Sequence, residues 1–303
     1  MKLVFFGTSS FAVPALHSLA PHVSLVVSQP DRPGGRGMKL NVSPVKSAAL
    51  SLGLRVETPE KSRAPEFVDL LRDEDADALI VAAYGQILST KVLESAKRGG
   101  INLHGSILPA YRGAAPIQRA ILDGETETGV TLMQMDRGMD TGDIIDIART
   151  PIDPDETYGQ LQDRLAIIGA ELISLWIERI VAGDYPRSPQ NNDEATHAPK
   201  VEKPEAELSF LRPAAEEYNR YRAFTPSPGA WLQTASGLLR VSRMARSEAK
   251  GSSGEILATS PGLVVGFAGG ALEFVEVQPE GKKRMSGRDF ANGARLRPGS
   301  RLI

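Results

Sequence analysis

Residues 99–109 read Gly-Gly-Ile-Asn-Leu-His-Gly-Ser-Ile-Leu-Pro, and this stretch is the most informative part of the chain. Asn102 and His104 are two residues apart, and side chains two apart on a strand point to the same face. Gly105 lets the chain turn away from the strand, and Pro109 stiffens the segment that follows. An amide and an imidazole side by side can polarise a carbonyl group and move a proton. The stretch therefore predicts a reaction site at the end of a strand.

Strand-like and helix-like segments alternate in the first half of the chain. Apolar or β-branched runs predict strands over residues 2–7, 23–29, 78–83, 100–104 and 129–134. Helical spacing, alanine content and capping residues predict helices over residues 11–19, 42–52, 89–97, 116–123 and 157–181. This alternation predicts an α/β fold class with an open, mostly parallel, Rossmann-like sheet.

The pattern changes after residue 184. Residues 185–207 are rich in Pro, Asn, Asp and Lys without periodicity, which is typical of a linker. One helix is expected over residues 214–224, and short alternating runs predict strands over residues 230–234, 238–243, 254–258, 263–266 and 271–278. We therefore expect a first domain over residues 1–184, a linker over 185–207 and a smaller, OB-like β-barrel domain over 208–303.

The composition limits the classes of function. The 303 residues include no cysteine, which excludes disulfides, thiolate metal sites and cysteine nucleophiles and favours a reducing, cytoplasmic environment. The apolar run before Gly7 is too short for a signal peptide or a membrane span, so we expect no membrane partner.

The net charge of −2 hides an asymmetry along the chain. Residues 200–303 hold 16 Lys and Arg against 11 Asp and Glu, a net charge of +5, whereas residues 1–199 hold 19 against 26, a net charge of −7. Eleven of the basic residues lie in Arg240–Lys250 and Lys282–Arg301. A basic second half favours a polyanionic partner. An ordinary solvated basic surface is the alternative.

A carboxylate in the segment 134–143 completes the candidate reaction site. Asp140 lies between Gly138 and Gly142, after a predicted strand. Ligands of open α/β sheets gather at the carboxyl ends of strands, so we expect Asp140 to meet and orient His104. Taken singly, Asn102, His104 and Asp140 each have an ordinary structural explanation in a turn or a hydrogen-bonded core. Their convergence is the hypothesis.

Two loops bear on the choice of ligand. Gly7-Thr8-Ser9-Ser10 follows the first strand but lacks the second and third glycines of a dinucleotide fingerprint, so Gly7 is expected only to form the turn. The loop 29–40 contains Arg32, Arg36 and Lys39 and leaves a strand at its carboxyl end. It is suited to contact a phosphate backbone over the same cleft. A plain exposed loop is the alternative.

Several motifs together resemble the methionyl-tRNA formyltransferase family of folate-dependent formyltransferases. The resemblance spans essentially the whole chain, and the Asn-x-His core within it is shared by all folate-dependent formyltransferases. The motifs are FFGTSSFAVPAL at 5–16, QPDRPGGRGMKL at 29–40, VAAYGQIL at 81–88, INLHGSILPAYRGAAPIQRAI at 101–121, VTLMQMDRGMDTGDII at 130–145 and GKKRMSGRDF at 281–290.

The resemblance implies roles for particular residues. The catalytic residues of the family correspond to Asn102, His104 and Asp140. The folate-contacting tetrapeptide corresponds to Ser106, Ile107, Leu108 and Pro109. Its second position, Ile107, is usually leucine in the family. The residues expected to approach tRNA are Arg36, Lys39, Lys200 and Lys203. The segment RAFTPSPGAW departs from the more common family pattern at Thr225 and Ser227.

The implied activity is transfer of the formyl group of 10-formyltetrahydrofolate to the α-amino group of methionyl initiator tRNA, for translation initiation, by a monomer without a metal. A formyltransferase acting on a small amine, such as an amino sugar nucleotide or glycinamide ribonucleotide, would share the three catalytic residues without needing the basic second half. A non-catalytic RNA-binding protein would explain the charge asymmetry but not the three residues. A dehydrogenase is disfavoured by the missing glycines.

The charge asymmetry leads to a test by salt titration. If the basic stretches of residues 240–250 and 282–301 neutralise phosphates, the affinity for tRNA should fall steeply and log-linearly as salt rises, because counterions are released on binding. Filter binding or fluorescence anisotropy at several salt concentrations measures the slope. A flat response would mean that these basic residues only face solvent.

Overall fold

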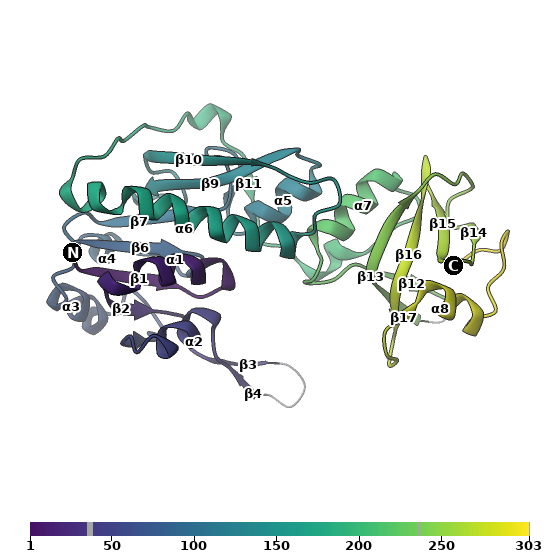
Figure 1. Cartoon of the computed structure of the whole chain (residues 1–303), viewed down its shortest axis with the longest axis horizontal. Coiled ribbons are helices and arrows are strands. Elements are labelled where there is room, and N and C mark those ends of the chain that lie inside the picture. Colours follow the sequence, from purple (N-terminus) through teal and green to yellow (C-terminus); the bar gives the residue numbers. More distant parts are fainter. Residues whose placement is uncertain (35–38, 236, 303) are drawn as a thin grey trace. The chain divides into compact units, whose positions relative to one another are not determined.

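Residues 1–34, 39–235 and 237–302 are described by a computed structural model, in which the chain forms two units (Figure 1). The first unit comprises Met1–Pro116, Glu127–Pro151 and Gln162–Pro199. The second comprises Ile117–Thr126, Ile152–Leu161 and Lys200–Ile303. The division is therefore not a single cut, because two short segments of the first half of the sequence belong to the second unit.

The first unit contains eleven strands among the described residues. They are β1 (Leu3–Gly7), β2 (Val23–Val27), β3 (Arg32–Gly34), β4 (Lys39–Asn41), β5 (Val56–Glu57), β6 (Ala78–Ala82), β7 (Gly100–His104), β8 (Arg112–Gly113), β9 (Glu127–Gln134), β10 (Ile144–Pro151) and β11 (His197–Ala198). Its helices are η1 (Ser10–Ala12), α1 (Val13–Leu19), η2 (Ala20–His22), α2 (Pro44–Ser51), α3 (Pro65–Asp73), α4 (Thr90–Leu93), most of α6 (Tyr158–Ala182) and η3 (Asn192–Glu194).

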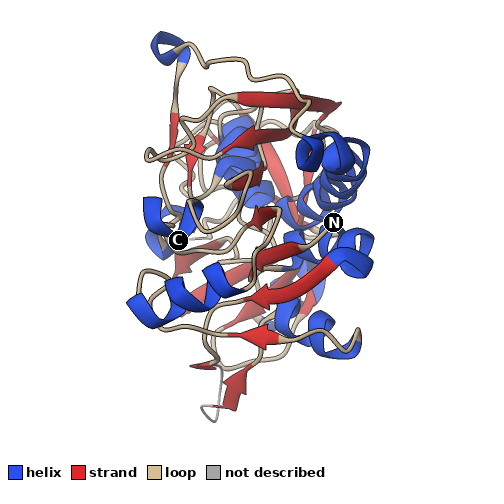
Figure 2. Cartoon of the chain, turned by 90° about the vertical axis from the view of Figure 1, so that its left-hand side faces the viewer, coloured by secondary structure: helices blue, strands red, loops and turns tan. Residues whose placement is uncertain are grey.

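Seven of these strands form one sheet in the order β10-β9-β7-β6-β1-β2-β5. The five adjacent strands β7, β6, β1, β2 and β5 run parallel to one another. In contrast, β9 is antiparallel to both β7 and β10. The mostly parallel α/β sheet predicted from the alternation is confirmed. Figure 2 shows helices on both sides of this stack of strands.

The two faces of the sheet are covered by different helices. Alternate residues such as Val4, Phe6 and Val81 belong to a core cluster with residues of α3 and α4. Leu103 lies on the other face, since a Cβ on Gly169 of α6 would be 3.8 Å from it. Because successive residues of a strand point to opposite faces of the sheet, Asn102 and His104 lie on the face that α3 and α4 cover.

Two segments expected to be irregular contain ordered structure. In the described part of the loop 29–40, β3 and β4 form an antiparallel hairpin. Within the expected linker, β11 pairs in parallel with β8, and Ser188 exchanges two backbone hydrogen bonds with Ile144 at 2.8 and 2.9 Å. Polar composition without periodicity does not distinguish a free linker from a segment held by main-chain contacts.

The second unit is built on an antiparallel sheet. Its elements are most of α5 (Pro116–Leu122), η4 (Lys203–Ala206), α7 (Ala214–Ala223), β12 (Trp231–Thr234), β13 (Gly237–Ser247), β14 (Ile256–Ala258), β15 (Leu263–Phe267), β16 (Gly270–Pro279), β17 (Met285–Ser286) and α8 (Gly287–Gly293). The order is β12-β13-β16-β15-β14, with β17 beside β16. Among the described residues β12 and β14 form no ladder with each other, as in a partly open barrel of OB type.

The core of the second unit combines both faces of this curved sheet with helices. It includes Tyr218 and Tyr221 of α7, Phe267 and Phe274 of the sheet, and Phe290 of α8. A buried carboxylate also holds this unit together, because Glu217 is fully buried and accepts from Arg212 and Arg220. The separate antiparallel domain predicted for the second half is confirmed.

The two glycines that bound α8 provide a matched test of packing. A Cβ on Gly287 would overlap the carbonyl oxygen of Phe274, whereas a Cβ on Gly293 meets nothing within 4 Å. Gly287→Ala should therefore destabilise the chain by about 1–3 kcal/mol, the usual cost of overpacking. Gly293→Ala should change stability by less than about 1 kcal/mol. Urea unfolding followed by circular dichroism compares the two, and equal midpoints would contradict the close approach.

Candidate active site

Strand β7 carries the two residues singled out from the sequence. All five of its residues are buried, with Asn102 at 9% and His104 at 6% exposure. The register places Asn102 between Val81 of β6 and Met133 of β9. Central position in the sheet fixes the backbone on both sides, so the directions of the amide and the imidazole are set by the ladders.

His104 contacts a main-chain carbonyl and a carboxylate. Its Nε2 donates to the carbonyl oxygen of Tyr111 at 2.9 Å, because a carbonyl oxygen can only accept. The other ring nitrogen, Nδ1, lies 3.6 Å from Oδ2 of Asp140. That distance is longer than a normal hydrogen bond, so the pair is in electrostatic contact. Nδ1 is therefore the nitrogen that remains for a reacting group.

The route by which Asp140 reaches His104 differs from the one expected. Because β9 is antiparallel to β7, Gln134 at the end of β9 pairs with Ile101, near the start of β7. The loop 135–143 therefore leaves the opposite edge of the sheet and returns to place Asp140 beside His104. The expected meeting of the two groups occurs, but the antiparallel ladder makes the loop responsible for it.

Asp140 is held by main-chain interactions. Its backbone has a φ of +55°, a left-handed conformation that is uncommon for a residue with a side chain. The N–H of Gly113 donates to its Oδ2 at 2.9 Å. The amide of Gln190 donates to the carbonyl oxygens of Asp140 and Gly142. Gly113 thus holds the carboxylate of Asp140 and Gln190 holds its main chain.

The Asn102 amide has a different character. Asn102 is 9% exposed, and the described part of the chain provides no hydrogen-bond partner for its side chain. Its amide atoms are not among the sealed atoms without a partner, so they are open to a ligand. An unpaired carboxamide on the same face as His104 is therefore suited to bind an oxygen of a substrate.

The tetrapeptide 106–109 turns directly after β7. The hydroxyl of Ser106 donates to the carbonyl of Ala110 at 2.7 Å. Thr131 of β9 holds the turn from below, since its Oγ1 donates to the carbonyl of Ser106 at 2.6 Å and accepts from the N–H of Leu108 at 3.1 Å. Ser106 and Leu108 are buried, whereas Ile107 and Pro109 are half-buried and available to a ligand.

Hydrogen bonds connect the carboxyl ends of β1, β2 and β6, the strands that lie on the side of β7 away from β9. Thr8 donates through Oγ1 to the carbonyl of Tyr84 at 2.7 Å, and Gln29 donates through Nε2 to the same oxygen at 3.3 Å. Burial raises the pKa of the Tyr84 phenol to about 12, so it stays protonated at neutral pH. A Cβ on Gly7 would crowd Ala12 at 2.9 Å, in keeping with a turn-forming glycine.

The residues expected to approach tRNA belong to different parts of the chain. Arg36 lies outside the described residues, and Lys39 begins β4. Lys200 and Lys203 belong to the second unit, where both are exposed. The structure therefore brings His104 to Asp140 with Asn102 on the same face of β7, whereas the expected tRNA contacts are divided between the two units.

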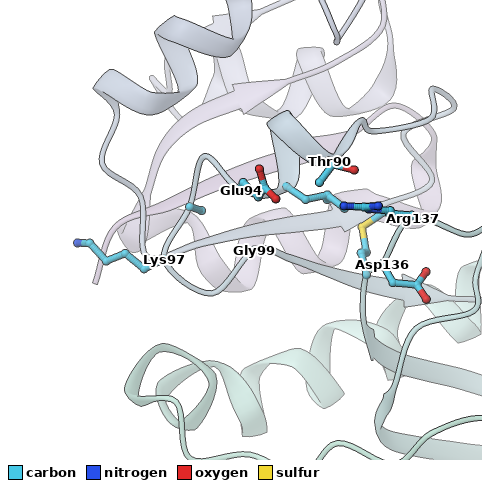
Figure 3. A pocket seen from close by; sticks show the side chains of 9 residues that line it. Thr90, Glu94, Lys97, Gly99, Asp136 and Arg137 are labelled. Atoms are coloured by element: carbon cyan, nitrogen blue, oxygen red, sulfur yellow. The ribbon is translucent and has the colours of Figure 1, made fainter.

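A cavity of about 480 Å³ lies beside the start of β7. Figure 3 shows Thr90 and Glu94 from the region of α4 on one side and Asp136 and Arg137 from the loop after β9 on the other. Asn102, His104 and Asp140 do not line it. The cavity borders the first residues of the loop that carries Asp140.

Four groups in the site were not foreseen from the sequence. They are the carbonyl of Tyr111, the hydroxyl of Thr131, and the side chains of Arg112 and Gln190. A backbone carbonyl has no residue-type signal, and a buried threonine on a strand reads as ordinary β-propensity. Arg112 lies within the family motif at residues 101–121, whereas Gln190 lies in the expected linker.

Comparison with known proteins shows the family of the chain. Residues 1–177 match the family described as formyl transferase, and residues 200–295 match the formyl transferase C-terminal domain. The methionyl-tRNA formyltransferase of Symbiobacterium thermophilum is 46% identical over 100% of this chain and 95% of its own length. That of Myxococcus xanthus is 43% identical over 99% and 97%. The chain belongs to the methionyl-tRNA formyltransferase family. It is a formyl-transferring enzyme, as the motifs predicted.

Solved structures share the fold of this family member. An N-formyltransferase of Helicobacter canadensis, in complex with folinic acid and dTDP-3-aminofucose, has a TM-score of 0.67 at 21% identity and covers 90% of this chain and 98% of its own. HypX of Aquifex aeolicus in complex with tetrahydrofolic acid has a TM-score of 0.64 at 16% identity, over 96% of this chain and 47% of its own.

Within the described ranges, none of the helices combines the length and the apolar character needed to cross a membrane.

The hydrogen bonds of Thr131 can be tested against a neighbour on the same strand. Thr131→Val keeps the shape but leaves the Ser106 carbonyl and the Leu108 N–H without their partner, which should cost about 1–3 kcal/mol of stability. It should also raise KM for the formyl donor, since the tetrapeptide loses its support. Thermal unfolding and steady-state kinetics measure both effects.

Thr128→Val is the matched control. Thr128 is also buried on β9, and the described residues give its hydroxyl no hydrogen bond. Its replacement should leave both quantities nearly unchanged. A Thr131→Val variant that behaves like this control would show that the turn does not depend on the hydroxyl.

Proposed function

We propose that Asn102, His104 and Asp140 carry out the transfer of a formyl group from 10-formyltetrahydrofolate to the α-amino group of methionyl initiator tRNA. The observation that carries this proposal is the contact of His104 Nδ1 with Asp140 beside an unpaired Asn102 amide, in a chain of this family. The product is the formylated initiator used to begin translation.

The two groups on β7 stabilise charge on the formyl oxygen. As the amine attacks, negative charge develops on that oxygen, and the Asn102 amide donates a hydrogen bond to it. When the ring carries a proton on both nitrogens, His104 donates a second hydrogen bond from Nδ1, because Nε2 is already bound to Tyr111. Donors that are aimed before the reaction lose little reorganisation energy, which makes this type of stabilisation effective.

Asp140 faces Nδ1 of His104 and is placed to move protons. An α-amino group titrates near pH ~8, so a substantial neutral fraction is present at physiological pH. The carboxylate takes the proton that the attacking amine loses, through a water molecule, and returns it to the departing nitrogen. The 3.6 Å separation from Nδ1 allows Asp140 to act without a tight bond to the ring.

The residues present fit the formyl donor, which supplies the one-carbon unit and leaves as tetrahydrofolate. Ser106 and Leu108 are turned inward and satisfied by Ala110 and Thr131, so they shape the turn. Ile107 and Pro109 offer apolar surface that suits the flat rings of a folate. On this basis we assign Ile107 and Pro109 to contact with the donor, and Ser106 and Leu108 to support of the turn that presents them.

The second unit is proposed to bind the tRNA, and the first to carry out catalysis. The second unit exposes three arginines on β13, Arg240, Arg243 and Arg246. It also exposes Lys200 and Lys203, which lie just before and at the start of η4. We propose the same role for Arg36 and Lys39 of the loop 29–40. The cytoplasmic location and the monomeric state stay predictions, the latter open to light scattering.

Replacement of Asn102 tests the proposed chemistry. Asn102→Ala should lower kcat by about 10²–10³, the typical loss of one oxyanion donor. The assay supplies 10-formyltetrahydrofolate with charged initiator tRNA and follows formylmethionyl-tRNA. Circular dichroism confirms that the variant is folded, and unchanged turnover in a folded variant would reject the assigned role.

A parallel assay addresses the alternative acceptor. The wild-type enzyme is given 10-formyltetrahydrofolate with an amino sugar nucleotide or glycinamide ribonucleotide in place of tRNA. Formylation of the small amine at a rate comparable to that of methionyl-tRNA would overturn the proposed acceptor while leaving the catalytic residues in place.

A further inference from the structure

The side chain of Gln190 joins the two segments that hold His104. Its Nε2 donates to the carbonyl oxygens of Asp140 at 2.9 Å and Gly142 at 2.7 Å, which uses both amide hydrogens. Its Oε1 accepts from Nε and Nη2 of Arg112 at 3.0 and 2.7 Å. We infer that Gln190 is a positioning residue that sets the place of Asp140 relative to His104, an inference that rests on the proposed function.

Arg112 gives Gln190 a fixed anchor. Its side chain is buried, at 6% exposure, and its planar fork binds the Gln190 oxygen with two N–H groups. The residues on either side of Arg112 both act on the site: the carbonyl of Tyr111 accepts from His104, and the N–H of Gly113 donates to Asp140. The same short segment therefore fixes the imidazole and the carboxylate.

The Asp140 loop needs such support. Asp140 adopts a left-handed backbone that persists only where the surroundings fix it. The Gln190 amide binds the main chain at Asp140 itself and again two residues later. Without these bonds, the Gly113 N–H would be the one hydrogen-bond partner that Asp140 keeps from another segment of the described chain. A carboxylate displaced by about 1 Å can lower a rate by up to roughly 100-fold.

Gln190 belongs to a segment, residues 188–198, that we name the brace. At one end, Ser188 pairs with Ile144 at the start of β10. At the other, Thr196 accepts through Oγ1 from the N–H of Tyr111 at 2.8 Å and through its carbonyl from the N–H of Arg112 at 2.9 Å. The brace thus contacts the start of β10 at one end and residues 111–112 at the other. The side chain of Gln190 connects it to the Asp140 loop.

Two replacements of Gln190 separate its contact with the Asp140 loop from its contact with Arg112. Gln190→Met keeps the length and removes all the hydrogen bonds. Gln190→Glu keeps an oxygen for Arg112 but places a carboxylate against two carbonyl oxygens, so only the loop contact is lost. Both variants should lower kcat by about 10- to 100-fold, with KM for methionyl-tRNA within about 2-fold of the wild type.

Asn191→Ala is the matched control. Asn191 is the next residue of the brace, and its side chain bonds only to Asp193 and Glu194 of the adjacent turn among the described residues. This variant should retain wild-type kcat. A loss equal to that of Gln190→Met would mean that any disturbance of the brace lowers activity, and would overturn a specific role of Gln190.

A double-mutant cycle with Asp140→Asn shows whether Gln190 acts through Asp140. If it does, Gln190→Met should cause no further loss of kcat, to within about 2-fold, in the Asp140→Asn background. A purely structural effect would multiply in that background, and a full additional loss would therefore overturn the inference.

A spectroscopic measurement does not depend on activity. The chain has four histidines, and the ¹⁵N resonances of His104 can be assigned by comparison with a His104→Gln variant. Gln190→Met should shift the His104 ring resonances, while Asn191→Ala should not. A wild-type chain that formylates no methionyl-tRNA overturns the proposed function, whereas unshifted His104 resonances in Gln190→Met overturn the positioning role.

Discussion

The position of β7 in the sheet is the constraint on which the site depends. This strand is buried along its whole length, between a parallel neighbour, β6, and an antiparallel one, β9. Ladders on both sides remove the freedom to rotate or slip, since a one-residue slip would exchange its two faces. Leu103 then packs toward α6, while Asn102 and His104 face the other way. Apolar packing on one face and chemistry on the other follow from a single register.

Main-chain groups hold the catalytic side chains from several directions. A carbonyl fixes the proton on Nε2 of His104, and an N–H fixes one oxygen of Asp140. Such bonds depend on the fold of short segments and not on the identity of their side chains. The polar side chains that reinforce them, Thr131 and Gln190, are each bonded to two backbone groups. The result is a site prepared before a substrate enters.

The sequence predicted the elements that carry a local signal. The bounds of β7 agree with the predicted strand, and the Asn-x-His spacing identified the face. Residues 129–134 were predicted as a strand, but a buried apolar run is alike in parallel and antiparallel sheets, so the direction of β9 and the path to Asp140 could not be predicted. Strand β10 and helix α3 were not predicted, and the expected helix over 89–97 is a single turn, Thr90–Leu93. The contacts of Gln190 were hidden because they join residues about 50 apart in sequence.

The division of the chain has a consequence for its synthesis. Residues of α5 and the start of α6 are complete long before residues 200–303 leave the ribosome, yet they pack with them. Arg119 pairs with Glu205, and Tyr218 donates to Asp155, so these partners must wait for one another. A nascent chain that ends at Pro199 therefore presents uncovered surface from its middle segments. These segments become covered only after the last residues emerge, and surface that is exposed until then favours aggregation of the growing polypeptide.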